Sequence, residues 1–269
     1  AATDGSSEPR KLTNSKGGED NYQWSAASDK VYFIAKRDGD EAPQLYVLPL
    51  SGGEAQRLTT LSTGVSDVKF SSDGSRIIFS SRVFPTAFTD SASKKLADEK
   101  KKIKTKARVY QSFPVRYWDS WLDEKQGHIF TMDLKSGSKP VNLMASISLV
   151  NSPGFRLGSY NFSADGKSVV FTATTEYNTT AYQSAKSNIY AVSLSGGKET
   201  VLVNDETDYS TAEFTEDGKY LIASGSAIGN KLYYLNRIYR FDATSLSAKK
   251  ELAATLDRPI NDMEIAGSS

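Results

Sequence analysis

The sequence predicts an all-β fold: a partial, open β-propeller of about four four-stranded antiparallel blades, with one helical insertion. Three observations predict it. A hairpin motif centred on Asp-Gly recurs along the 269 residues, a second hairpin motif alternates with it, and one charged stretch interrupts the alternation. One copy of each motif supplies four strands, which is the content of a propeller blade of roughly 40–50 residues.

The first motif is an aromatic residue, a short polar stretch that usually ends in Asp-Gly, and an apolar strand. Asp-Gly between two apolar runs predicts a tight hairpin, because glycine accepts a positive φ in the turn. The copies begin at Phe70, Phe162 and Phe214, and a degenerate copy begins at Trp24.

The second motif is a strand of alternating apolar residues, a turn rich in Gly and Ser, and another strand. Its copies cover residues 45–58, 129–143, 189–202 and, more weakly, 238–252. Together the motifs predict a single propeller fragment over residues 1–269, with blades at 20–61, 65–146, 156–204 and 208–256.

Both ends of the chain repeat parts of a blade. Residues 9–13 resemble the blade-closing segment 56–59, and residues 260–265 resemble the blade-opening segment 65–70. We therefore expect partial blades at both ends. A propeller needs closure to protect its sheet edges, so we also expect more chain on both sides or a partner that covers the edges.

Residues 84–126 form the insertion into the second blade. Residues 90–108 predict a helix with a narrow apolar face made of Leu96, Ile103 and Ala107. Its cluster of Lys and Arg would suit phosphate groups. No aromatic side chains that could stack on bases are interleaved with the cations, so a solvated helix on the propeller rim is the favoured interpretation.

The segment after this helix concentrates Trp and acidic residues that the blade repeat does not require. Aromatic faces and carboxylates together suit the recognition of a cationic or peptide group. The alternative is structural: the Trp side chains would fasten the insertion to its blade, and the arginine would pair with a carboxylate. The candidate substrate-binding residues are Arg116, Trp118, Asp119, Trp121, Asp123 and Glu124.

Catalytic and cofactor motifs are not found. There is no Gly-x-Ser-x-Gly sequence, P-loop or Rossmann fingerprint, and the chain has no Cys and one His. That residue, His128, begins a repeat strand as Gln44, Asn188 and Arg237 do in the other copies, which favours a structural role. We expect no catalytic residue, no cofactor and no metal. A net charge of +1 and the lack of a long apolar run favour neither nucleic acid nor membrane as a partner.

The Phe-Ser-x-Asp-Gly blades resemble the propeller of the prolyl oligopeptidase family of serine peptidases. The segment 113–123, between a Lys-rich stretch and His128, resembles the dipeptidyl peptidase and acylaminoacyl-peptidase branch. Those enzymes carry an α/β-hydrolase domain after the propeller. The resemblance implies a non-catalytic propeller that gates and binds peptide substrates for such a domain of the same parent chain, so this chain alone would be inactive.

Related dipeptidyl peptidases bind the peptide ammonium group with acids from a propeller insertion, and Asp119, Asp123 and Glu124 are the acids in the matching insertion here. The resemblance favours a periplasmic or secreted location and leaves room for a homo-oligomer. The alternative function is a TolB-like protein-binding propeller without enzymatic activity, because such propellers share the blade repeat. A sugar-active propeller is a third option. The insertion favours the peptidase interpretation, since a docking propeller does not need it.

Overall fold

The computed structural model describes residues 4–13, 17–105, 107–110, 113–135, 137–231, 233–260 and 263–265. The chain divides into two compact units, Ala1–Ser66 and Asp67–Ser269. The predicted partial blade at the C-terminal end includes residues 261 and 262, which lie outside the described residues. No helix among the described residues is long and apolar enough to span a membrane.

The first unit contains one four-stranded antiparallel sheet in the order β1-β2-β3-β4. The central strands carry its core, in which Phe33 and Tyr46 pair across β2 and β3 and stack with ring centroids 5.8 Å apart. The strands are β1 (Glu19–Trp24), β2 (Lys30–Ala35), β3 (Gln44–Pro49) and β4 (Gln56–Arg57).

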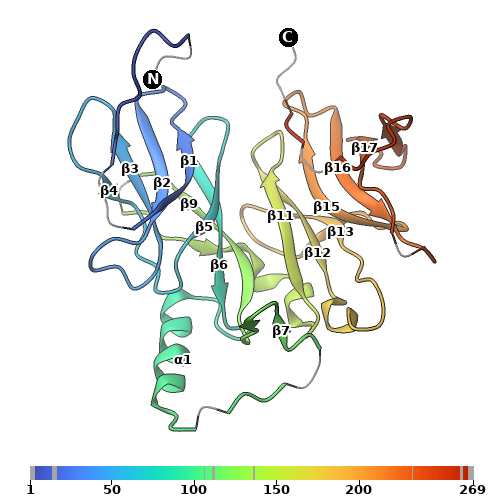
Figure 1. The fold of residues 1–269 in the computed structure, drawn as a ribbon, viewed down its shortest axis with the longest axis horizontal. Helices are drawn as coiled ribbons and strands as arrows, with labels where there is room; N and C mark the ends of the chain where they lie inside the picture. Colours follow the sequence, from blue (N-terminus) through green and yellow to red (C-terminus); the bar gives the residue numbers. More distant parts are fainter. Residues whose placement is uncertain are drawn as a thin grey trace. The chain divides into compact units, whose positions relative to one another are not determined.

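The second unit contains three four-stranded antiparallel sheets that follow one another along the chain (Figure 1). The first has the order β10-β9-β6-β5, with β5 (Ser66–Phe70), β6 (Arg76–Val83), β9 (Gln126–Asp133) and β10 (Val141–Asn142). The second is formed by β11 (Arg156–Phe162), β12 (Ser168–Thr174), β13 (Asn188–Ser193) and β14 (Thr200–Val203). The third is formed by β15 (Thr207–Phe214), β16 (Tyr220–Ala227), β17 (Arg237–Asp242) and β18 (Lys250–Leu252).

Neighbouring sheets of the second unit pack through their apolar faces. One buried cluster joins Ile78 and Ile129 to Val169 and Phe171 of the next sheet. A second cluster joins the other face of that sheet, through Val170, to β16 and β17. Short 3₁₀ helices η1 (Leu143–Ser146), η2 (Leu149–Asn151) and η3 (Tyr177–Thr179) lie in the connections.

The Asp-Gly motifs form the turns that the sequence predicts. In the turn before β6, Asp73 accepts hydrogen bonds from the Ser71 hydroxyl at 2.6 Å and from the Ser75 backbone at 3.0 Å, and Gly74 has φ 67°. These hydrogen bonds lower the pKa of Asp73 to about 2. The same contacts recur around Asp165 and Asp217. The acidic residues of the repeat are therefore turn formers, as expected.

A β-bulge interrupts the first strand of three sheets. The register shifts between Asp20 and Gln23, between Leu157 and Tyr160, and between Tyr209 and Thr211. In the bulge of β11, a Cβ on Gly158 would come within 2.3 Å of the Thr172 hydroxyl oxygen. This close approach leaves no room for a Cβ unless Thr172 moves, which favours glycine at this position.

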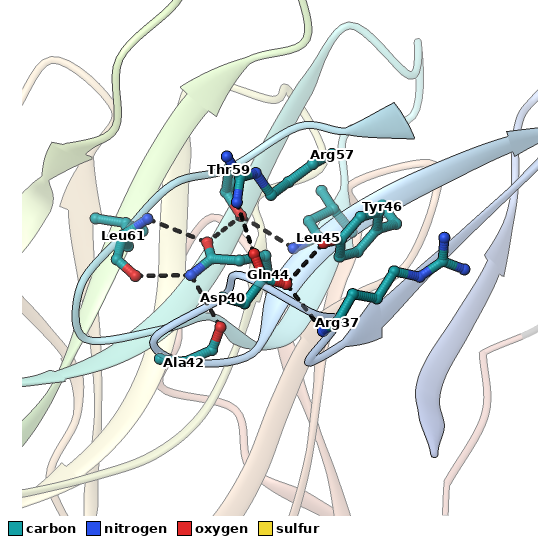
Figure 2. A network of polar contacts seen from close by, with 9 residues as sticks. All are labelled: Arg37, Asp40, Ala42, Gln44, Leu45, Tyr46, Arg57, Thr59 and Leu61. Carbon is teal, nitrogen blue, oxygen red and sulfur yellow. Dashed lines mark hydrogen bonds and ion pairs between the residues drawn. The ribbon is translucent and has the colours of Figure 1, made fainter. Parts of the chain in front are cut away.

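A buried glutamine fixes the chain that leaves the first sheet (Figure 2). The Gln44 amide nitrogen donates to the carbonyl oxygens of Ala42 (3.1 Å) and Leu61 (2.7 Å). Its oxygen accepts from the Thr59 hydroxyl (2.8 Å) and from the Leu61 backbone N–H (3.1 Å). All four hydrogen-bonding positions of the side chain are used, so burial leaves nothing unsatisfied.

An acidic residue fixes the β2–β3 connection beside this glutamine (Figure 2). The Asp40 carboxylate, 1% exposed, accepts from the Tyr46 hydroxyl (2.6 Å), the Arg57 guanidinium (2.7 Å) and the Arg37 backbone N–H (3.0 Å). Burial acts to raise the pKa of Asp40, but these hydrogen bonds outweigh it and the pKa is lowered. The Arg37 side chain stacks on the Tyr46 ring at 4.7 Å. The network joins β3, β4 and the turn before them.

The predicted fold class is confirmed: four four-stranded antiparallel sheets and one helical insertion. Within the described part of the chain, each sheet uses strands from its own stretch of sequence, so no sheet combines both ends of the chain. The predicted helix over residues 90–108 is too long. Helix α1 spans Asp90–Lys102 and is followed by extended backbone at Ile103 (φ −70°, ψ 119°); Ile103 is 60% exposed, so burial of its side chain does not support a longer helix.

Candidate binding site in the insertion

The insertion leaves and re-enters the second unit at one pair of strands. β6 and β9 pair without interruption from Arg76 opposite Asp133 to Val83 opposite Gln126. The chain between Val83 and Gln126 therefore leaves and returns at a single end of this sheet, and Figure 1 shows α1 and β7 at that end. A fixed base of this kind positions the inserted residues, although most of them are exposed.

Helix α1 begins at a local cap and is attached to the base of the insertion. The Thr89 hydroxyl accepts from the Ala92 backbone N–H at 3.2 Å, which satisfies one free donor of the first turn. In the last turn, the Lys100 ammonium lies 2.8 Å from the Glu124 carboxylate and 5.6 Å from the centroid of the Phe84 ring. The last turn of the helix therefore contacts the segment that returns to β9.

The Trp-rich segment forms a small hairpin of two two-residue strands, β7 (Arg116–Tyr117) and β8 (Ser120–Trp121). Its turn consists of Trp118 and Asp119. Trp118 has φ 52°, in the left-handed region that bulky residues avoid, and its side chain is 82% exposed. Two-residue hairpin turns commonly need a positive φ at their first position, and here Trp118 occupies that position in place of glycine.

The three candidate acids differ in what holds them. Asp123 accepts from the Arg82 guanidinium at 2.6 Å, and Glu124 pairs with Lys100. Asp119, at the tip, accepts a hydrogen bond from its neighbour Ser120 at 3.2 Å and has no cationic partner among the described residues. Two of the acids thus pair with cations of β6 and α1, and Asp119 makes no such pair among the described residues.

The contacts expected under the structural alternative, between the Trp side chains and the blade and between Arg116 and a carboxylate, are not found among the described residues. Trp118 is exposed, and Trp121 stacks on Tyr110 of the insertion itself, with ring centroids 6.1 Å apart, while remaining 54% exposed. Arg116, expected by that alternative to pair with a carboxylate, has no such partner in the described ranges. The hairpin therefore presents two indole rings, a guanidinium and a carboxylate to solvent.

His128, the single histidine, lies apart from these residues in the core. It is fully buried, with Nδ1 3.1 Å from the Asn142 side-chain nitrogen, and its ring stacks on Phe88 at 5.8 Å and meets the edge of Phe155 at 6.4 Å. Burial lowers its pKa to about 4 and outweighs the opposing effect of the contact with Asn142. A neutral, enclosed imidazole of this kind supports the core.

Sequence reasoning missed the residues that support the hairpin. Arg82, Lys100 and Tyr110 hold Asp123, Glu124 and Trp121, yet none belongs to a recognisable motif. The one indication of these contacts in the sequence was compositional: a Lys-rich stretch is followed by an acid-rich one, which favours ion pairs between them. Among the described residues, no three His, Cys, Asp or Glu side chains gather in a group that could hold a metal ion.

A family model and a curated relative each match part of the chain. Residues 1–85 match the family model for the dipeptidyl peptidase IV (DPP IV) N-terminal region. Over 56 residues, 21% of this chain and 8% of the other, the chain is 43% identical to the uncharacterized peptidase YuxL of Bacillus subtilis.

Two solved structures have similar folds. TolB from Acinetobacter baumannii has a TM-score of 0.53 at 15% identity, with 93% of this chain and 47% of that chain covered. The β-propeller domain of the trilobed protease from Pyrococcus furiosus has a TM-score of 0.54 at 10% identity, with 91% of this chain and 60% of that chain covered. The chain thus spans less than two thirds of each of these proteins.

The sheets and these structural neighbours define a β-propeller. The predicted resemblance to the propeller of the prolyl oligopeptidase family, in its dipeptidyl peptidase branch, is confirmed by the family model and by the peptidase relative.

Proposed function

We propose that this chain is the non-catalytic propeller of a serine exopeptidase of the dipeptidyl peptidase or acylaminoacyl-peptidase type. In this proposal the propeller gates and binds peptide substrates for an α/β-hydrolase domain of the same parent chain. The observation that carries the proposal is the hairpin tip: Asp119 without a cationic partner in the described structure, beside the exposed Trp118 and Trp121. A carboxylate next to aromatic faces is suited to an ammonium group.

The roles within the hairpin follow from its contacts. Asp119 accepts a hydrogen bond from the free ammonium group of the peptide, and Arg116 donates one to a carbonyl oxygen of the substrate. Trp118 and Trp121 pack against the first side chains of the peptide. Asp123 and Glu124 hold the hairpin through Arg82 and Lys100. In this proposal Asp119 binds the ligand, and Asp123 and Glu124 support the hairpin.

The kinetic test uses the full-length parent enzyme. Asp119→Asn is expected to reduce kcat/KM for dipeptidyl nitroanilides with a free N-terminus by about 10-fold or more, since a charge-assisted hydrogen bond contributes about 1.5–3 kcal/mol. Substrates with an acetylated N-terminus should be unaffected. Asp98→Asn is the matched control, because Asp98 is an exposed acid on α1 that pairs with Lys101. Equal kcat/KM in the wild type and Asp119→Asn on both substrate types would refute the assignment.

The TolB-like alternative rests on the shared fold and predicts binding of a protein partner without turnover. Both functions predict that the 269-residue chain alone does not hydrolyse peptide nitroanilides. Turnover by this chain that a serine-directed inhibitor abolishes would contradict both. The two functions separate in the parent protein, where only the peptidase proposal predicts turnover that depends on Asp119.

A further inference from the structure

The second unit has a pocket far from the hairpin in sequence, at the entrance of β11. It has a volume of about 370 Å³, within the range of roughly 300–1,000 Å³ that small-molecule sites occupy. Its wall is formed by two consecutive sheets, because β11 supplies Arg156 and Leu157 while β15 supplies Asp208. The η3 connection adds Tyr177 and Thr180.

The Arg156 side chain is oriented by an aromatic ring and not by an ion pair. Its guanidinium carbon lies 4.3 Å from the centroid of the Tyr177 ring. The chain under this ring is itself fixed, since the Tyr177 backbone N–H donates to the Gly154 carbonyl at 2.9 Å. In the described part of the chain, no carboxylate pairs with Arg156. Stacking therefore orients the planar guanidinium and leaves its donors free for a ligand.

Asp208 supplies the opposite charge from the neighbouring sheet. Its Oδ1 accepts from the Ser187 backbone N–H at 2.8 Å, and the Tyr209 backbone N–H donates to the Ser187 carbonyl at 3.0 Å. The first contact holds the carboxylate, and the second joins the backbone of β15 to Ser187 beside it. Its second oxygen makes no hydrogen bond to any described residue, so it can accept from a ligand.

We propose that this pocket binds a small zwitterion, a free amino acid or a short peptide. The carboxylate of the ligand lies against the Arg156 guanidinium, and its ammonium group lies against Asp208. Guanidinium matches carboxylate and phosphate equally well in shape. Asp208 favours a carboxylate ligand that also carries an ammonium group, because the negative charge of Asp208 repels a phosphate dianion and attracts the ammonium group. The proposal does not depend on the proposed function, since no residue of the hairpin takes part.

The test is calorimetric titration of the 269-residue chain with L-alanyl-L-alanine at millimolar concentrations. Two modified peptides remove one charge each: the C-terminal amide lacks the carboxylate, and the N-acetyl form lacks the ammonium. Each is expected to bind at least 10-fold more weakly than the parent dipeptide. Inorganic phosphate is expected to bind more weakly than the dipeptide as well.

The variants assign the site. Arg156→Gln and Asp208→Asn are each expected to weaken dipeptide binding 10-fold or more, and Arg156→Lys to restore only part of it because the planar fork is lost. Arg240→Gln is the matched control: Arg240 stacks on Tyr220 at the same 4.3 Å but is not among the residues that line this pocket. The proposal is overturned if the dipeptide does not bind, if Arg156→Gln binds as well as the wild type, or if phosphate binds more tightly.

Discussion

The buried imidazole of His128 makes the stability of the second unit depend on pH in one defined window. Its pKa is lowered from 6.5 to about 4 by burial. Between these values the unfolded chain binds a proton that the folded chain excludes, so stability falls as the pH decreases from 6.5 and levels off below 4. The shift corresponds to about 3 kcal/mol, since one pKa unit is worth about 1.4 kcal/mol.

The variant His128→Gln isolates this contribution. Glutamine does not titrate, it keeps a donor and an acceptor for Asn142, and Gln44 already occupies the corresponding place in the first sheet. Urea unfolding of the wild type and the variant at pH 7 and pH 4 gives the comparison. The wild type is expected to lose about 3 kcal/mol more than the variant. Titrating carboxyl groups, including the half-buried Glu213 with its raised pKa, are common to both proteins and cancel.

A direct measurement of the same pKa is available because the chain has one histidine. Its ring protons give a single set of NMR signals, whose shift with pH reports the pKa without site assignment. A midpoint near 4 is expected. A midpoint near 6.5, or equal losses of stability in the wild type and His128→Gln, would refute the claim that this side chain is enclosed and neutral.

Two further predictions concern stability and are checked by urea unfolding. Gln44→Ala should cost about 3 kcal/mol, because it leaves several buried backbone partners unsatisfied, whereas the exposed Gln56→Ala should stay within about 0.5 kcal/mol. Equal effects of the two substitutions would contradict the role given to the Gln44 network. Gly158→Ala should cost about 1–3 kcal/mol, because its Cβ would collide with Thr172, whereas Gly18→Ala, with open space around it, should not destabilise. A stable Gly158→Ala protein would show that the bulge can relax.

The parts of the fold that follow local rules could be predicted from the sequence. Asp73 and Gly74 form their turn with hydrogen bonds to residues two positions away, so the motif carries its own structure. The end of α1 could not be predicted in the same way. Whether Ile103 continues the helix depends on a surface to pack against, and that surface is a property of the tertiary structure.

The identity of the candidate hairpin residues was accessible from sequence, but their separate roles were not. Asp119 and Asp123 look equivalent in the chain. They differ because Arg82, 41 positions from Asp123, lies within 2.6 Å of one and not of the other. The pocket at Arg156 was not predicted, since Tyr177 reaches it from the β12–β13 connection of the same sheet and Asp208 from the next sheet. Long-range contacts of this kind leave no periodic trace in a single sequence.

A polar residue at or near the start of the third strand shows, in three of the four sheets, how the repeated unit has diverged; in the other sheet Asn188 donates to Tyr190 of its own strand. Gln44 binds Leu61, His128 binds Asn142, and Arg237 donates to the carbonyls of Leu256 and Arg258, so in each case a long polar side chain holds the segment that follows or forms the outer strand. Three chemically different residues perform one task. Duplicated segments can therefore keep a shared anchoring function after their sequence similarity at that position is lost, and exchanging these residues between copies would measure how interchangeable the copies still are.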